Sequence, residues 1–226
     1  CHIGSQIFEL GPYQEAIQIV LAFAAQMREH GVELTEFSPG GGFAIAYTRD
    51  QNPPRVDEYA EAITASLIQG IRELGLSAPT LMVEPGRSIV GPAGVALYTV
   101  GARKEIPGVR TYISVDGGMG DNIRPALYEA EYEAVVANHM DSATEDHVTI
   151  AGKFCESGDI LIEDIDLAPT EPGDIIAIPA SGAYCIPMAS NYNMAPRPAV
   201  VMVKDGKGRI IRRRETYADL MAVDLI

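Results

Sequence analysis

The stretch Glu84-Pro85-Gly86-Arg87-Ser88 directly follows the apolar run Thr80-Leu81-Met82-Val83. The apolar run has the length and the bounding residues of a short buried strand. The strand therefore ends in a carboxylate, a rigid Pro-Gly turn and a guanidinium group. In α/β proteins, loops converge on a ligand at the carboxyl ends of parallel strands. A structural salt bridge beside a turn would use the same residues, so the surrounding sequence has to decide between the two interpretations.

The residues before this stretch alternate between helical and extended patterns. Apolar side chains recur at helical spacing from Pro12 to His30 and again from Val56 to Leu74. Short strands are expected in residues 1–7, over Val32–Phe37 and in the run that ends at Glu84. This alternation predicts parallel βα units. Three strands are too few to close a barrel, because a complete (β/α)₈ barrel takes about 250 residues.

The residues after Arg87 follow a different pattern, in which Gly, Pro, Asn and Asp separate short runs of β-forming residues. The runs cover residues 95–100, 111–115, 134–136, 147–151, 174–178 and 198–203. A helical pattern returns at Tyr217–Val223. We therefore predict an α/β part over residues 1–87 and an all-β domain of sandwich or barrel type over residues 88–226.

Composition limits the class of protein. The chain has 226 residues, of which 47% are hydrophobic and 21% are charged, as in ordinary globular proteins. Its net charge of −14 argues against nucleic acid or an anionic membrane as a partner. No apolar run approaches the roughly 20 residues that span a bilayer. The three cysteines are too few and too scattered for a disulfide framework, so a reducing, cytoplasmic setting is expected.

Three loops rich in small residues stand out in the second part, at residues 116–128, 152–159 and 181–193. The first carries Arg124 and Tyr128, which could hold a carboxylate through a guanidinium fork and a phenol donor. Long turns without a function are the structural alternative. No helix is expected in these loops, and none of them has the pattern of a dinucleotide or Walker A loop.

The second loop places the thiol of Cys155 beside the carboxylate of Glu156. A thiol can serve as an acid or as a nucleophile. Neighbouring carboxylates do not lower the pKa of a thiol, so a neutral proton donor is favoured over a resting thiolate. A metal site is not expected, since the chain has no CxxC motif and its four histidines lack ligand spacing.

In the first part, Gly40-Gly41-Gly42 follows a predicted strand. Three consecutive glycines allow backbone N–H groups to approach an anion closely, although a flexible connector would have the same composition. His2 lies next to Gly4 and Ser5, and a lone histidine is more often structural than catalytic.

Taken in order, these segments resemble the diaminopimelate decarboxylases over essentially the whole chain. The segments are His2–Gln6, Gly40–Gly42, Glu84–Arg87, Asp116–Tyr128, Cys155–Asp159, and Gly182–Tyr184 with Ala189–Asn193. The resemblance implies a pyridoxal-phosphate enzyme of the alanine racemase-like fold. Residues 1–87 would then be the last strands of a TIM-type (β/α)₈ barrel, and residues 88–226 a C-terminal β-sandwich or β-barrel domain.

The resemblance also implies roles in holding pyridoxal 5'-phosphate. Glu84 would pair with the pyridine nitrogen and keep it protonated, which makes the ring an electron sink. His2 would pack on the ring face. The phosphate would be held by Ser5, Gly40, Gly41, Gly42, the backbone at Gly86 and Arg87, and the hydroxyl of Tyr184.

The implied substrate is meso-diaminopimelate, which would lose CO₂ from its D-centre to give L-lysine, the last step of lysine biosynthesis. Substrate-binding residues by resemblance are Arg87, Arg124, Tyr128 and Tyr184, with Glu156 for the far ammonium group. The first three would hold the far carboxylate. Cys155 would return a proton to the carbanion. Cys155 and Glu156 would reach into the site of the other subunit, which implies a homodimer with shared active sites.

The sequence departs from the family pattern in its lysines. The cofactor lysine of the family lies early in the barrel, whereas the four lysines here are Lys104, Lys153, Lys204 and Lys207. The chain also opens at Cys1, as if inside a strand. We therefore expect the C-terminal portion of a longer polypeptide, inactive by itself. The lysine-bearing N-terminal half would be cleaved, left out or supplied by another chain.

Two alternatives remain open from the sequence. One is another decarboxylase of the same fold type, acting on ornithine, arginine or carboxynorspermidine. The other is a non-catalytic homologue that regulates through protein contact. The presence together of Glu84, Arg87, Cys155 and Glu156 argues against the second, because a silent homologue need not keep all four.

Overall fold

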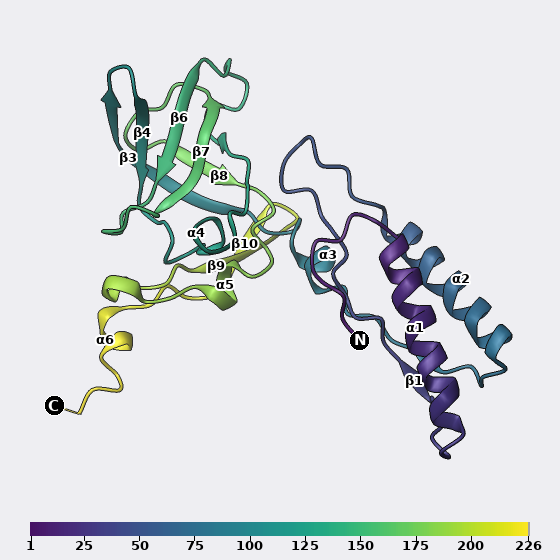
Figure 1. Cartoon of the computed structure of the whole chain (residues 1–226). Helices are drawn as coiled ribbons and strands as arrows, with labels where there is room; N and C mark the ends of the chain where they lie inside the picture. Colours follow the sequence, from purple (N-terminus) through teal and green to yellow (C-terminus); the bar gives the residue numbers. More distant parts are fainter. Residues whose placement is uncertain (226) are drawn as a thin grey trace. The chain divides into compact units, whose positions relative to one another are not determined.

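The computed structural model describes residues 1–225, which form two compact units, residues 1–93 and residues 94–225 (Figure 1). The division after Ala93 leaves the short helix α3 (Gly86–Val90) within the first unit. The boundary expected at residue 87 falls inside that helix. Among residues 1–225, no helix combines the length and the apolar character needed to cross a membrane.

Two long helices, α1 (Gly11–Arg28) and α2 (Val56–Leu74), lie side by side in the first unit (Figure 1). Their fully or almost fully buried residues recur every three or four positions, which puts them on one face of each helix. These residues are Tyr13, Ile17 and Leu21 on α1, and Tyr59, Ile63 and Leu67 on α2. The helical periodicity of the sequence thus predicted both helices, and α1 ends two residues before the predicted end.

Three extended segments of the first unit run parallel. Strand β1 (Glu36–Phe37) pairs with β2 (Thr80–Leu81), and the pairing continues as a bridge from Gly41 to Glu84. Ile7 forms a parallel bridge to Phe43 on the other side. The strands expected over residues 1–7 and 32–37 are therefore much shorter than predicted. Pro39 lacks an N–H donor and the glycines after it have no side chains to pack, which interrupts regular pairing.

A six-stranded sheet, in the order β5-β8-β3-β4-β6-β7, forms the centre of the second unit. The strands are β3 (Ala96–Ile106), β4 (Arg110–Val115), β5 (Val135–Val136), β6 (Asp146–Ala151), β7 (Ile160–Leu167) and β8 (Ile175–Ile178). β4 and β6 are parallel, and the other neighbours are antiparallel. A separate hairpin follows, formed by β9 (Val200–Lys204) and β10 (Lys207–Arg212).

Several elements of the second unit differ from the prediction. Strands β7 and β10 were missed, because acidic residues in β7 and basic residues in β10 interrupt the apolar pattern. The loops expected to lack helix contain α4 (Arg124–Tyr128), α5 (Cys185–Met188) and a 3₁₀ turn at Tyr192–Met194. Helices of one turn are too short to show a hydrophobic period. The last predicted helix is present as α6 (Tyr217–Leu220).

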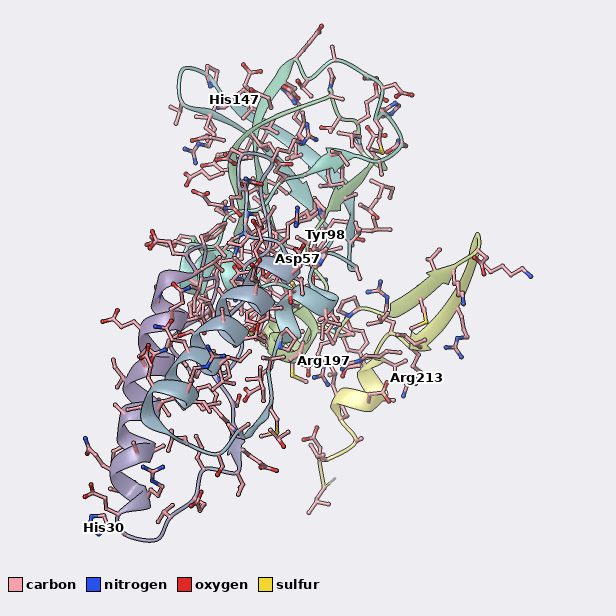
Figure 2. The ribbon with its side chains drawn as sticks, turned by 90° about the vertical axis from the view of Figure 1, so that its right-hand side faces the viewer. His30, Asp57, Tyr98, His147, Arg197 and Arg213 are labelled. Atoms are coloured by element: carbon pink, nitrogen blue, oxygen red, sulfur yellow. The ribbon has the colours of Figure 1, made fainter. Side chains whose placement is uncertain are left out.

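Ion pairs stabilise the segment around α6, and Figure 2 labels the two arginines that form them, Arg197 and Arg213. Arg197 forms an ion pair with Glu215, and Arg213 forms one with Asp219. The Glu215 carboxylate also accepts hydrogen bonds from the Arg197 backbone N–H at 2.9 Å and from Asn191 Nδ2 at 2.7 Å. The Arg197 guanidinium and these donors lower the pKa of Glu215 to about 2.

This lowered pKa predicts how the stability of the protein depends on pH. A carboxyl group with a depressed folded-state pKa contributes its full stabilisation above its unfolded-state pKa, near 4.5, and loses it as the pH falls through about 2. Replacing Glu215 with Gln should therefore lower the midpoint of urea unfolding at pH 7. The difference from the parent protein should shrink steadily below pH 4.5. An unchanging difference between pH 7 and pH 2.5 would contradict this assignment.

Candidate active site

In the first unit, Glu84 lies where the parallel segments end. Its backbone N–H donates to the Gly40 carbonyl at 2.9 Å, and its carbonyl lies in the bridge to Gly41. Its carboxylate accepts a hydrogen bond from Ser38 Oγ at 3.1 Å and is exposed. The backbone is thus anchored by the strand pairing, while the carboxylate remains accessible to a cationic group.

Arg87, on α3, is buried and joins two distant loops. Its Nη2 donates to Ser5 Oγ at 2.7 Å, and its Nη1 donates to the Tyr47 hydroxyl. The guanidinium carbon also lies 5.6 Å from the centre of the Tyr47 ring. Residues 47–55 are mostly polar in sequence, but Tyr47 is buried. A large aromatic residue in an otherwise polar stretch was the signal that could have revealed this contact.

The three glycines owe their identity to close packing of the chain. A Cβ atom on Gly41 would lie 1.9 Å from the Glu84 carbonyl oxygen, and one on Gly42 would lie 2.3 Å from the Gly4 carbonyl oxygen. A Cβ atom on Gly40 would lie 2.8 Å from His2 Nδ1. The glycines therefore allow the chain around His2 and the end of β2 to come together. This packing accounts for the glycines by itself, and their contact with an anion stays a prediction.

The residues of the first unit fit pyridoxal phosphate in their chemistry. The exposed carboxylate of Glu84 matches a pyridinium nitrogen, and the joined hydroxyl and guanidinium of Ser5 and Arg87 match a phosphate group. A Cβ atom on Gly86 would meet no other atom within 4 Å, so the backbone there is open to a ligand. Residues 1–103 contain no lysine, so the amine to which this cofactor attaches is not in the first unit.

In the second unit, the three loops that the sequence singled out contact one another. The Lys153 N–H donates to the Gly117 carbonyl at 2.9 Å, which joins the first loop to the second. The Ser190 N–H donates to the Gly120 carbonyl at 2.9 Å, which joins the first loop to the third. The Tyr192 hydroxyl of the third loop donates to the Glu156 carboxylate of the second. The structure therefore brings these three loops of the second unit into one cluster.

Arg124, the first residue of α4, is buried and held by aromatic side chains. Its Nη1 donates to the Tyr132 hydroxyl, and its guanidinium carbon lies 5.6 Å from the Tyr132 ring centre and 5.7 Å from the Tyr184 ring centre. The Tyr132 hydroxyl also lies 3.9 Å from Cys185 Sγ, and burial raises the pKa of the Cys185 thiol. Tyr132 was not predicted as a site residue. Its position four residues after Tyr128 was the signal in the sequence that could have identified it.

The other predicted residues of the second unit are exposed. Tyr128, at the end of α4, is 62% exposed, and both Cys155 and Glu156 are exposed. The hydrogen bond to Glu156 raises the pKa of Tyr192. Within residues 1–225, no group of three or more His, Cys, Asp or Glu side chains is arranged to hold a metal ion.

Comparison with known proteins shows what each part of the chain is similar to. Residues 1–91 match the family described as "Pyridoxal-dependent decarboxylase, pyridoxal binding domain". The diaminopimelate decarboxylase of Bacillus subtilis is 48% identical over 226 residues, which are the whole of this chain and 52% of that protein. The chain therefore spans about half the length of the curated relatives that it matches.

Solved structures give the same result. A diaminopimelate decarboxylase from M. jannaschii, in co-complex with L-lysine, matches this chain with a TM-score of 0.93 and 38% sequence identity. The match covers 100% of this chain and 51% of the M. jannaschii chain. A lysine/ornithine decarboxylase from Vibrio vulnificus, complexed with putrescine, has a TM-score of 0.75 and 26% identity, with 87% of this chain and 51% of that one covered. The chain is thus a homologue of about half of a diaminopimelate decarboxylase, and its first 91 residues match the pyridoxal-binding domain model of the pyridoxal-dependent decarboxylases.

Proposed function

We propose that this chain forms the greater part of the cofactor and substrate sites of a pyridoxal-phosphate-dependent decarboxylase that converts meso-diaminopimelate into L-lysine and CO₂. The observation that carries the proposal is the similarity to diaminopimelate decarboxylases along the whole chain, both in sequence and in structure. In this proposal the first unit is the closing part of a (β/α)₈ barrel, and the second is a β domain of sandwich or barrel type.

The first unit would hold the cofactor. Glu84 would bind the pyridine nitrogen and keep it protonated, and the exposed imidazole of His2 would lie against the ring. Ser5 and Arg87 would bind the phosphate together with Gly40, Gly41, Gly42, the backbone at Gly86 and the Tyr184 hydroxyl. When bound, pyridoxal phosphate supplies an electron sink for the electron pair left behind by departing CO₂. The role of Glu84 is to maintain the ring charge on which that chemistry depends.

The second unit would recognise the far end of the substrate. Arg124 and Tyr128 would bind the far carboxylate together with Arg87, and Glu156 would bind the far ammonium group. The Cys155 thiol would donate the proton that replaces the lost carboxylate. The thiol is accessible for this step, because Cys155 is exposed.

The proposed enzyme needs residues beyond this chain. The cofactor lysine would come from an additional half, of the kind that the longer relatives contain. The 226 residues alone would therefore be inactive. Cys155 and Glu156 would serve the site of a second subunit in a homodimer. The dimer rests on the resemblance, and a cytoplasmic setting rests on the small number of scattered cysteines.

A second candidate function is decarboxylation of ornithine or lysine. The likeness to the lysine/ornithine decarboxylase favours it, but that identity is 26%, against 48% for the diaminopimelate decarboxylase of Bacillus subtilis. The two functions differ in the far end of the substrate, since diaminopimelate carries a carboxylate there and ornithine and lysine do not. The buried guanidinium of Arg124 suits the dicarboxylic substrate.

A chimeric enzyme tests this proposal. In it, the present 226 residues replace the matching half of the Bacillus subtilis relative, which supplies the cofactor lysine. We expect release of CO₂ from meso-diaminopimelate with kcat/KM at least about 100-fold above that for ornithine, arginine or carboxynorspermidine, because a site built to bind a polar group of its substrate discriminates strongly against analogues that lack that group. A chimera that binds pyridoxal phosphate, as its absorbance shows, but prefers ornithine would overturn the assignment of substrate.

A further inference from the structure

Asp159 is a buried carboxylate that lies between two of the loops of the second unit. We propose that Asp159 is a positioning residue, which fixes the loop carrying Cys155 and Glu156 against the Gly-rich loop that leads into Arg124. This inference rests on the proposed function, because it concerns the placement of residues that we assign to the substrate. Asp159 itself is 2% exposed and touches neither the proposed substrate nor the cofactor in this account.

The two oxygens of the Asp159 carboxylate bind different loops. Oδ1 accepts a hydrogen bond from the Met119 N–H at 2.6 Å, and Oδ2 accepts one from the Phe154 N–H at 2.7 Å. Both donors are backbone groups, so the contacts fix the path of the chain rather than a side-chain rotamer. An asparagine could accept only one of these bonds, because its second terminal atom is itself a donor. The geometry therefore calls for a carboxylate at this position.

Neighbouring glycines make room for the carboxylate. A Cβ atom on Gly152 would lie 2.2 Å from Asp159 Oδ2, and one on Gly118 would lie 2.4 Å from Oδ1. The three atoms nearest to each of these Cβ positions all belong to the Asp159 side chain. At both positions a side chain would overlap the Asp159 carboxylate. This steric limit explains why glycine occurs in both loops.

In each loop, backbone hydrogen bonds connect Asp159 to a proposed site residue. In the second loop, the Asp159 N–H donates to the Glu156 carbonyl at 3.1 Å, so Glu156 is one tight turn away from the carboxylate. In the first loop, the Asn122 N–H donates to the Gly118 carbonyl at 3.0 Å, and Asn122 Oδ1 accepts from the Arg124 N–H at 3.3 Å. The carboxylate therefore lies within one turn of Glu156, and three successive hydrogen bonds, at Met119, Asn122 and Arg124, connect it to Arg124.

Burial of the Asp159 carboxylate has a free-energy cost, because it removes the charged group from water. Desolvation raises the pKa of Asp159, and the N–H groups of Met119 and Phe154 oppose that rise only in part. The ionised side chain thus destabilises the folded state at neutral pH relative to its protonated form. A buried carboxylate with such a cost is consistent with a role in the site rather than in stability.

The test compares Asp159→Asn with the matched variant Asp174→Asn in the chimeric enzyme. Asp174 is also buried and accepts hydrogen bonds, from the Glu171 N–H at 2.8 Å and from Asn138 Nδ2 at 2.5 Å, but it does not join the loops. We expect kcat/KM for meso-diaminopimelate to fall about 100-fold in Asp159→Asn, the effect of a displacement of about 1 Å in a site. Asp174→Asn should stay within about 3-fold of the parent. Equal losses in the two variants, or none in Asp159→Asn, would overturn the proposal.

Two further measurements separate this inference from the proposed function. Hydrogen exchange of the Met119 and Phe154 amides should become at least about 10-fold faster in Asp159→Asn, whichever reaction the protein catalyses. The Gly152→Ala substitution should lower stability in the parent but much less in an Asp159→Ala background, since the clashing carboxylate is then absent. Unchanged exchange or additive effects would refute the positioning role. An inactive parent chimera with these two results intact would instead refute the proposed function.

Discussion

Replacing Gly41 with Ala is expected to destabilise the protein by about 3 kcal/mol or more, the upper end of the range for overpacking. An added Cβ atom would lie 1.9 Å from the Glu84 carbonyl oxygen and 2.8 Å from the Glu84 carbonyl carbon. Both atoms belong to the backbone of the parallel bridge, so no side-chain rotation can relieve the clash. The segment that ends at Glu84 would have to move away, and the carboxylate would move with it.

Thermal unfolding measures this effect, and Gly11→Ala provides the matched control. A Cβ atom on Gly11, the first residue of α1, meets no atom within 4 Å outside its chain neighbours, so this substitution should change stability by no more than about 1 kcal/mol. Gly41→Ala should also weaken pyridoxal phosphate binding in the chimera because Glu84 is displaced. A melting temperature for Gly41→Ala equal to that of Gly11→Ala would show that the two segments are not packed as described.

Replacing Arg124 with Ala is expected to lower kcat/KM for meso-diaminopimelate by at least about 30-fold, mainly through KM. Truncating one partner of a buried, hydrogen-bonded charge pair costs about 2–5 kcal/mol, and the substrate carboxylate would be left without its fork of donors. Arg124→Lys keeps the charge but loses the planar fork, so it should recover only part of the binding. Tyr132→Phe should have a smaller effect of the same kind, because it removes the hydrogen bond that orients Arg124 and keeps the ring.

Steady-state kinetics on the chimera measure these effects, with Arg103→Ala as the control. Arg103 forms an ion pair with Asp146 on the sheet and has no contact with the three loops among the described interactions. It should leave KM within about 2-fold of the parent. If Arg124→Ala leaves KM unchanged, Arg124 does not bind the far carboxylate and the choice of a dicarboxylic substrate loses its main support.

The sequence predicted the elements that have a clear period of apolar residues, and it did not predict those without one. Helices α1 and α2 each carry several turns of apolar residues, and both were found close to their actual bounds. Strand β7 was missed because Glu163, Asp164 and Asp166 lie within it, and their exposed side chains mask the buried ones. Single-turn helices such as α4 and α5 depend on contacts with residues far along the chain, which no local pattern records.

The candidate site shows a similar division. The motifs identified Arg87 and Arg124, because charged residues beside glycine-rich turns are visible locally. Their aromatic partners, Tyr47 and Tyr132, were not identified, since each contact forms only when distant parts of a unit pack together. Asp159 lies at the end of a sequence motif, but its contacts with both loops appear only in the structure.

The central claim is that this chain supplies binding residues while the cofactor lysine lies outside its 226 residues. The most direct test is to treat the chimeric enzyme with pyridoxal phosphate, reduce it with borohydride and locate the cofactor by peptide mass spectrometry. We predict that the cofactor is attached to a lysine of the Bacillus subtilis half, and that the 226-residue chain alone acquires no stoichiometric label. Stoichiometric attachment to Lys104, Lys153, Lys204 or Lys207 would contradict the account.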